Sequence, residues 1–265
     1  MIEPEIMTYY EHGGEHHRLA TGAGRLEFLR TWDVLGRVLP GPPGRILDVG
    51  GATGVYAAPL ARAGYDVLVI DPVPDHVAAA GACDGVAATL GDARSLPVPD
   101  GGADAVLLLG PLYHLPERGD RVTAWREAAR AARTGGVVIG AGISRFASML
   151  DGFGKGFFAE PGYRPLVEGA LRDGAHRNVA DRERWFTSAY FHRPEEAAAE
   201  AGEAGLREVR TVAVEGPVWL TGPRVDEFLD DPRLAELTLD MLRRVEAEPS
   251  LLGASSHLLT IGRTA

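Results

Sequence analysis

The chain has 265 residues, 45% of them hydrophobic, and a formal net charge of -10 at pH 7. This length and apolar content can build one enlarged domain or a core with a cap. The negative charge, without any run of basic residues, argues against binding to nucleic acid or to an anionic membrane surface. The single cysteine excludes an internal disulfide and a cysteine-based zinc cluster. Because the acidic N-terminus does not have the layout of a signal peptide and no long apolar run occurs, we expect a cytoplasmic protein.

Strand and helix patterns alternate along the first half of the chain, as is typical of a parallel sheet in an α/β fold. Runs of β-branched and other apolar residues predict the strands, and apolar residues at helical spacing predict the helices. Proline and glycine mark the turns between them. The predicted helices are 25–39, 55–63, 75–80 with Asp75 as its cap, and 120–133, and the predicted strands are 45–49, 65–70, 85–90, 103–109 and 137–141.

Two inserts interrupt this alternation in the second half of the chain. Residues 144–190 combine weak periodicity with many aromatic residues, which predicts an inserted cap. Its aromatic side chains either line an acceptor cavity or form the core of the cap itself. The remaining predicted elements are a helix at 194–204, a strand at 206–214, a helix at about 231–247 within the second insert, and a final strand at 257–261.

The most informative motif lies between the first predicted strand and the helix that follows it. Residues 48–54 read Asp-Val-Gly-Gly-Ala-Thr-Gly. Glycines at this point let the backbone approach a ligand closely, and the N-terminus of the next helix offers unpaired N–H groups. Ala52 and Val55 stand where a dinucleotide-binding fingerprint needs its second and third glycines, and the Gly-Lys-Ser/Thr ending of a phosphate loop is absent. The spacing therefore disfavours both of these nucleotide-binding motifs.

This stretch resembles motif I of the class I S-adenosylmethionine-dependent methyltransferases, in which an acidic residue precedes glycines at alternate positions, with Ala52 in place of the middle glycine. The resemblance extends to Asp71, which matches the acidic residue that accepts hydrogen bonds from the ribose hydroxyls. Pro72 and Val73 would then lie beside the adenine. The resemblance covers about 25–141 and 194–214, and it implies that S-adenosylmethionine is the cofactor and S-adenosylhomocysteine the product.

Two further segments match the same family. Asp92 resembles the residue that accepts a hydrogen bond from the adenine amino group, and the amide of Ala93 would donate to a ring nitrogen. Residues 109–115 resemble the segment that lines the methyl-transfer site in small-molecule members of the family. The N-terminal segment around Tyr10 and Arg18 resembles a lid that contacts the methionine end of the cofactor. The complete set of cofactor-binding residues implied by the resemblance is Tyr10, Arg18, Asp48, Gly50, Gly51, Gly54, Asp71, Pro72, Val73, Asp92, Ala93, Leu109 and Gly110.

The predicted fold is an α/β, Rossmann-like domain with a seven-stranded, mostly parallel sheet flanked by helices and with inserted helical and aromatic caps. A single domain would occupy residues 1–265, with an N-terminal lid at 1–24. Its core would comprise about 25–142, 193–214 and 257–265, and its caps about 143–192 and 215–256. Three histidines in the lid have no matched acidic or cysteine partners, so we expect a solvated polar segment there and no metal.

Methyl transfer from a sulfonium is an in-line displacement, so the protein must align the acceptor, exclude water and remove a proton where the acceptor requires it. His114 is the first candidate base, because its loop faces the predicted transfer site, and His192, at the junction of cap and core, is the second. Each also fits a structural role, in shaping the cofactor pocket or in beginning a helix. Tyr113, Arg145 and Tyr190 are the candidate substrate-binding residues.

The residues therefore predict transfer of a methyl group to oxygen, nitrogen or carbon of a small molecule, in specialised metabolism for example. A peptide or protein acceptor, an NAD(P)-dependent oxidoreductase and a non-catalytic binding module are the alternatives. The oxidoreductase needs a glycine where Val55 stands and a Tyr-x-x-x-Lys pair, whereas Asp151 precedes Lys155. A binding module would show degraded cofactor motifs, and these motifs are intact. The acceptor, the base and the oligomeric state stay open.

Overall fold

The computed structural model describes residues 19–179 and 182–265. Its first half follows the predicted alternation, and β5 is the one strand that is much longer than predicted. Asp75 was expected to cap α5, but that helix begins one residue before it, so Asp75 lies in the first turn. The elements are α3 (Gly22–Val38), β1 (Arg45–Val49), α4 (Ala57–Arg62), β2 (Asp66–Asp71), α5 (Pro74–Gly81), β3 (Val86–Leu90), β4 (Ala103–Leu108), η1 (Pro111–His114), α6 (Arg118–Ala131) and β5 (Ala132–Ser144).

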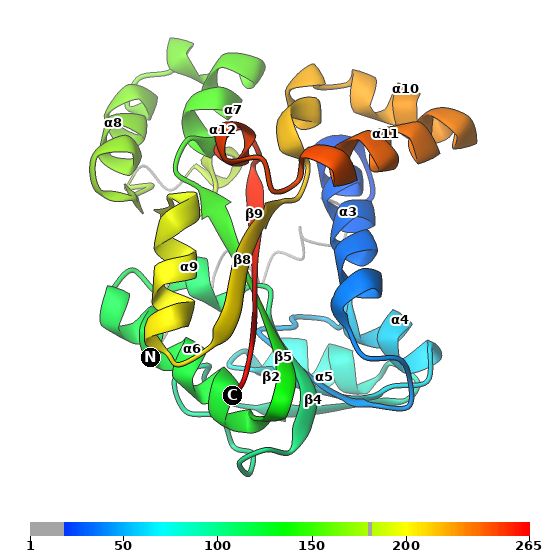
Figure 1. Cartoon of the computed structure of the whole chain (residues 1–265). Helices are drawn as coiled ribbons and strands as arrows, with labels where there is room; N and C mark the ends of the chain where they lie inside the picture. The colour runs from blue at the N-terminus through cyan, green and yellow to red at the C-terminus, as the bar shows by residue number, and fades with distance from the viewer. Residues whose placement is uncertain (1–18, 180–181) are drawn as a thin grey trace.

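A mostly parallel sheet forms the centre of the fold. Strands β1 to β5 are parallel in the order β3-β2-β1-β4-β5. Strand β9 (His257–Arg263) pairs antiparallel with β5, and β8 (Arg207–Ala213) pairs antiparallel with β9, so β8 again runs in the direction of β1 to β5. Figure 1 shows α3 and α4 on one side of the sheet and α6 and α9 (Pro194–Glu203) on the other. Because helices cover both faces, the central strand β4 is buried along almost its whole length, as expected for a strand covered on both sides.

Two groups of cap elements lie at the end of the sheet toward which β5 points (Figure 1). The second group contains α11, which matches the predicted helix, and three short helices, η4, α10 and α12, that were not predicted. None of the described helices is long and apolar enough to cross a membrane. The first group comprises α7 (Ala147–Lys155), η2 (Phe157–Ala159), α8 (Tyr163–Asp173), β6 (Ala175–His176), η3 (Glu183–Trp185) and β7 (Ala189–His192), and the second comprises η4 (Gly216–Thr221), α10 (Arg224–Asp230), α11 (Pro232–Val245) and α12 (Pro249–Leu252).

The first cap adds two strands to the sheet. Strand β7 runs parallel to the end of β5 and pairs on its other side with β6. In the described part of the chain the sheet therefore has nine strands: the seven predicted ones and these two. Aromatic side chains of the same cap pack on one another, with the ring of Tyr163 between 5.2 and 5.5 Å from those of Phe157, Phe158 and Trp185. These four aromatic residues form the core of the cap itself.

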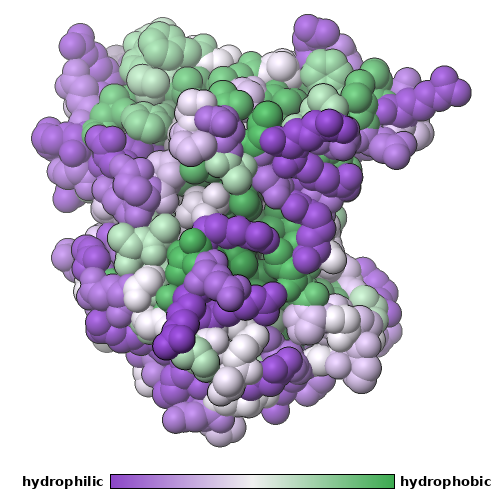
Figure 2. Space-filling model, in the orientation of Figure 1, coloured by the Kyte–Doolittle hydropathy of each residue, from purple (hydrophilic) through white to green (hydrophobic). Residues whose placement is uncertain are grey.

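The surface is hollowed between the body of the domain and the caps. Figure 2 shows hydrophobic residues gathered in the middle of one face, with hydrophilic residues around them. An exposed apolar patch bordered by polar residues is typical of a binding surface. The pocket described below lies at the carboxyl ends of the parallel strands.

Candidate active site

A cleft of about 1020 Å³, its opening to solvent included, lies at the carboxyl ends of β1, β2 and β4. The strand order turns back between β1 and β4, and ligands of open parallel sheets bind at such a reversal. The cleft is lined by Leu19, Asp48, Val49, Gly50, Gly51, Ala52, Val55, Tyr56, Ile70, Asp71, Pro72, Val73, His76, Gly91, Asp92, Ala93, Leu109, Gly110, Pro111, Tyr113, His114 and Leu115.

The glycine loop forms the floor of this cleft. Gly50 has a φ of 70°, and a Cβ there would lie 2.8 Å from Cδ of Pro111, so a side chain is excluded on two grounds. Ala52, which replaces the middle glycine of the motif, still adopts a left-handed φ of 47°. Gly54 does not line the cleft, and a Cβ there would instead meet Ala80 of α5. Ala52 thus holds a backbone conformation that is uncommon for a residue with a side chain.

Asp48 is a fully buried carboxylate beneath the glycine loop. It lines the cleft, and within the described residues neither of its side-chain oxygens has a hydrogen-bond partner. Burial, together with the negative charge of Asp71, raises the pKa of Asp48 to about 7. A buried acid without a donor is costly in a folded protein, so this position favours a ligand with a cationic group.

Asp71 ends β2 and is fixed by three neighbours. Its Oδ2 accepts a hydrogen bond from the backbone N–H of Ala52 at 3.0 Å, and its Oδ1 accepts one from that of Val73 at 3.0 Å. Nδ1 of His76 lies 3.1 Å from the same Oδ1. The sequence analysis missed His76, although its place five residues after Asp71, in the first turns of α5, is a local signal. Two carboxylates and an imidazole therefore meet under the loop.

Asp92 follows β3, the strand next to β2, and is held by an arginine. The Arg94 backbone and side chain donate to its carboxylate at 2.6 to 2.9 Å, and Arg94 also pairs with Asp120 at 2.7 Å. These hydrogen bonds hold the pKa of Asp92 below its usual value, against the effect of partial burial. Asp92 is therefore an ionised, oriented acceptor at the edge of the cleft.

The loop after β4 forms the remaining wall. Leu109, Gly110, Tyr113 and His114 all line the cleft, which is where the sequence analysis put them. The His114 ring lies 4.6 Å from that of Tyr113 and stacks at 6.3 Å on Phe186 of the first cap. His114 thus stands at the boundary between the cleft and the first cap, and its role as a base stays a prediction.

Three other predicted site residues lie away from the lining of the cleft. Arg145, Tyr190 and His192 are part of a buried set of polar residues between the first cap, α6 and α9. We call these buried polar residues the junction network, and it comprises Arg121, Arg145, Tyr190, His192, Glu196 and Glu200. The two remaining predicted residues, Tyr10 and Arg18, are outside the described residues.

The charges of the junction network are paired with one another. Arg121 binds Glu200 at 2.8 Å, and Nε2 of His192 lies 3.4 Å from the same carboxylate. Arg145 binds Glu196 at 2.8 Å, and the Tyr190 hydroxyl donates to Glu196 at 3.1 Å. Burial lowers the pKa of His192, so its ring is neutral near pH 7. This arrangement joins the cap to the core.

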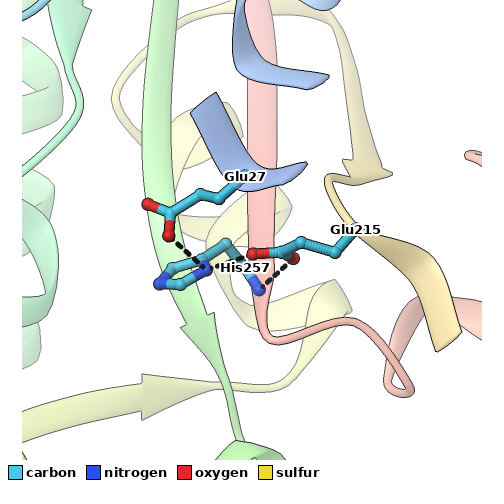
Figure 3. Close-up of side chains that lie close together, drawn as sticks. All are labelled: Glu27, Glu215 and His257. Atoms are coloured by element: carbon cyan, nitrogen blue, oxygen red, sulfur yellow. Dashed lines mark hydrogen bonds and ion pairs between the residues drawn. The ribbon is translucent and has the colours of Figure 1, made fainter. Parts of the chain in front are cut away.

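A second polar cluster lies on the rim above the sheet, as Figure 3 shows. Glu27, Glu215 and His257 each bring one potential metal-ligand atom within 4.8 Å of the others. Both oxygens of Glu215 already accept hydrogen bonds, from the hydroxyl of Ser255 and from His257. Glu215 is therefore already hydrogen-bonded within the protein through both of its oxygens. We call Glu27, Glu215 and His257 the rim cluster. The sequence analysis named none of its members.

Residues 47–140 match the family model described as a methyltransferase domain. An uncharacterized methyltransferase of Mycobacterium tuberculosis is 34% identical over 100 residues, which cover 37% of this chain and 40% of that protein. The 27-O-demethylrifamycin SV methyltransferase of Amycolatopsis mediterranei is 29% identical over 234 residues, 79% of this chain and 81% of that protein. A similar crystal structure is that of a Thermotoga maritima protein titled a SAM-dependent methyltransferase, possible histamine N-methyltransferase. The structural alignment covers 98% of this chain and 99% of that protein, with a TM-score of 0.60 and 18% sequence identity.

Proposed function

Because the chain belongs to the class I S-adenosylmethionine-dependent methyltransferases, we propose that it transfers the methyl group of S-adenosylmethionine to a small-molecule acceptor. The observation that carries this proposal is Asp48, a buried carboxylate that faces the cleft without a donor among the described residues. Since a fold alone does not establish an activity, the proposal depends on this site.

The donors of S-adenosylmethionine fit the acids of the cleft. Its cationic methionine end would be held by Asp48, its ribose hydroxyls by Asp71, and its adenine amino group by Asp92. These three acids follow or end three neighbouring strands, so they are spaced along one edge of the sheet. When bound, the cofactor supplies an electrophilic methyl group on a positively charged sulfur. The protein would bind it, orient it and keep water from the transfer site.

A small-molecule acceptor is supported by two observations. The alignment with the rifamycin-modifying relative spans 79% of the chain, which is far more than the methyltransferase domain alone. The wall after β4 also presents the aromatic ring of Tyr113 and the imidazole of His114, which with Phe186 of the cap form a mixed apolar and polar surface. Such a surface suits a compact, partly apolar acceptor.

Thermal unfolding with S-adenosylmethionine, S-adenosylhomocysteine and, as a control, NAD tests the cofactor. A ligand at about 100 times its Kd stabilises the protein by about 2.7 kcal/mol, which for a chain of this size raises Tm by roughly 5 to 10 °C. Mass spectrometry of 27-O-demethylrifamycin SV incubated with protein and cofactor then tests transfer. A Tm shift with NAD alone, or with none of the three ligands, would overturn the proposal.

A further inference from the structure

The rim cluster combines a fixed imidazole with two carboxylates from distant parts of the chain. Glu27 comes from α3, Glu215 follows β8, and His257 is the first residue of β9. Nδ1 of His257 lies 2.6 Å from Oε1 of Glu215 and 3.5 Å from Oε2 of Glu27. In Figure 3 the other ring nitrogen points away from Glu215.

Strand register puts His257 beyond the edge of the sheet where the cleft opens. Gly140 of β5 is level with Leu108, the last residue of β4, whereas His257 is level with Ile143, three residues further along β5. Three residues of strand correspond to about 10 Å. His257 therefore stands beyond the carboxyl ends of the strands, at the end of the sheet where the caps lie.

His257 also shares a face of the sheet with the wall of the cleft. Side chains two residues apart on a strand point to the same face, so His257 lies on the face of Leu259. Leu259 belongs to the hydrophobic cluster against which Tyr113 and Tyr56 pack, and both of these tyrosines line the cleft. The same face of α3 carries Glu27 two turns before Val34, which belongs to that cluster. The rim cluster and the tyrosines of the cleft wall therefore flank the same hydrophobic cluster, on one face of the sheet.

Glu215 fixes both the orientation and the tautomer of the ring. Its side chain is 1% exposed, against 19% for His257 and 12% for Glu27, so it stands behind the imidazole. It accepts hydrogen bonds from the Ser255 hydroxyl at 2.8 Å and from the backbone N–H of His257 at 3.0 Å. Although burial alone would raise the pKa of Glu215, the charge and hydrogen bonds of His257 hold that pKa below its usual value. An ionised Glu215 makes Nδ1 the donor and leaves Nε2 as the basic nitrogen.

We propose that His257 is the general base for a hydroxyl acceptor and that Glu215 is its positioning residue, an inference that rests on the proposed function. The acceptor O–H proton passes to Nε2 while the oxygen forms its bond to the methyl carbon of S-adenosylmethionine. The carbon–sulfur bond breaks and its electron pair stays on sulfur. The imidazolium is stabilised between Glu215 and Glu27, and it then returns its proton to water.

This assignment differs from the one that the sequence suggested. The described ring contacts of His114 are aromatic, with Tyr113 and Phe186, whereas His257 has two carboxylates beside Nδ1. A nearby carboxylate favours the protonated ring and so strengthens it as a base. A hydroxyl acceptor needs such a base, whereas a carboxylate acceptor does not.

Three variants separate a base from a structural link. His257→Asn keeps a side-chain donor near the position of Nδ1 but has no counterpart of Nε2, so a structural link would tolerate it. We expect its kcat to fall about 100-fold or more, with the affinity for S-adenosylmethionine unchanged. Arg263→Ala, at the exposed far end of the same strand, is the control and should retain the activity. Methyl transfer is measured with radiolabelled cofactor to 27-O-demethylrifamycin SV, to catechol and, as an amine, to benzylamine.

The pH profile provides a readout that a structural role would not change. The base must be unprotonated, so activity should fall as pH falls through the pKa of the ring. Within the described residues the charged groups facing the ring are Glu27 and Glu215. Glu27→Gln removes a charge from the partly exposed side of the ring, so the midpoint should move to lower pH by about one pH unit. This variant keeps the test decisive if substitutions of His257 reduce stability.

Each outcome supports or overturns the assignment. Hydroxyl methylation that is lost in His257→Asn and shifted in Glu27→Gln supports it. Wild-type rates in His257→Asn, transfer only to benzylamine, or cofactor binding without transfer to either hydroxyl compound overturns it. Activity that EDTA abolishes and Mg²⁺ restores also overturns it, because the rim cluster would then act through a metal. Failure to bind S-adenosylmethionine at all instead overturns the proposed function on which the inference rests.

Discussion

The cleft and the junction network are both buried and polar, but their charges are balanced in opposite ways. In the junction network the charges of Arg121, Arg145, Glu196 and Glu200 are paired with one another. In the cleft, Asp48 is fully buried and has no donor among the described residues. Buried charges that are paired within the protein stabilise a particular packing, whereas a buried charge without a partner favours a ligand that supplies one.

This difference shows why residue type alone could not sort the candidates. From the sequence, Arg145 and Tyr190 were candidate substrate-binding residues and His192, at the junction of cap and core, was the second candidate base. The structure gives each of them a partner within the network and leaves them out of the lining of the cleft. Pairing, which sequence does not display, is the feature that separates the two regions.

Breaking the junction network should produce the largest effect on stability. In Glu200→Ala the buried guanidinium of Arg121 loses its carboxylate, so we expect the free energy of unfolding to fall by about 3–5 kcal/mol. Urea unfolding followed by circular dichroism measures this change. Glu203→Ala removes an exposed partner of Arg118 and Arg126 from the end of the same helix and should cost less than about 1 kcal/mol. A Glu200→Ala protein that stays stable but loses affinity for S-adenosylmethionine would place the network in the binding site.

Removing Asp71 should have the largest effect on cofactor binding. Hydrogen bonds to a charged acceptor contribute about 1.5–3 kcal/mol each, so Asp71→Ala should weaken S-adenosylmethionine binding about 100-fold by calorimetry. Asp66→Ala is the matched control, because Asp66 begins the same strand and its side chain is 72% exposed. Equal affinities for the two variants would contradict the assignment of Asp71 to the ribose.

The part of the cleft that we propose for the cofactor could be predicted from the sequence because its determinants are local. Asp48 is the last but one residue of its strand, Asp71 ends the next and Asp92 follows the third closely, so spacing along the chain already puts the three acids at one edge of a parallel sheet. The glycine loop is continuous in sequence, and its one irregular position, Ala52, adopts a left-handed φ that glycine adopts readily. His76 is equally local, but Asp75 beside it offered a familiar helix-capping interpretation.

The remaining features depend on contacts between distant segments. Glu27, Glu215 and His257 come together only through the packing of α3 and the register of β5 with β9. Strands β6 and β7 contain two and four residues, too few for a periodic signal. Strand β5 begins before its predicted start because Ala132 pairs with Ala103 across an irregularity in register, although the glycines that follow indicated a turn.

The pH dependence of binding tests the unpaired charge of the cleft. Because the pKa of Asp48 is raised to about 7, the folded protein binds this proton more tightly than the unfolded chain does. The contribution of Asp48 to stability without ligand therefore falls as pH rises from its ordinary pKa of 3.8 through about 7. Pairing with a cationic ligand needs the ionised form, so affinity for S-adenosylmethionine should rise about tenfold between about pH 5.5 and about pH 7.

Two controls isolate the contribution of Asp48 to that pH dependence. Asp48→Asn cannot ionise, so its affinity for S-adenosylmethionine should be nearly constant over the same interval. 5′-Methylthioadenosine lacks the amino-acid end, so its affinity for the unaltered protein should change little. A tenfold rise that persists in Asp48→Asn would assign the titration to another group, and His76 beside Asp71 is then the first candidate.

His76 should have the smallest effect of the residues in the cleft, because it acts on the cofactor through Asp71. Its Nδ1 lies 3.1 Å from Oδ1 of Asp71, and the ring lines the cleft. Losing one hydrogen bond costs about 1 kcal/mol, so His76→Ala should weaken S-adenosylmethionine binding about fivefold by calorimetry. Asp75→Ala, at the exposed neighbouring position, should leave the affinity unchanged. A loss as large as that of Asp71→Ala would mean that His76 contacts the cofactor directly, and the cleft would then hold it through an imidazole as well as through its acids.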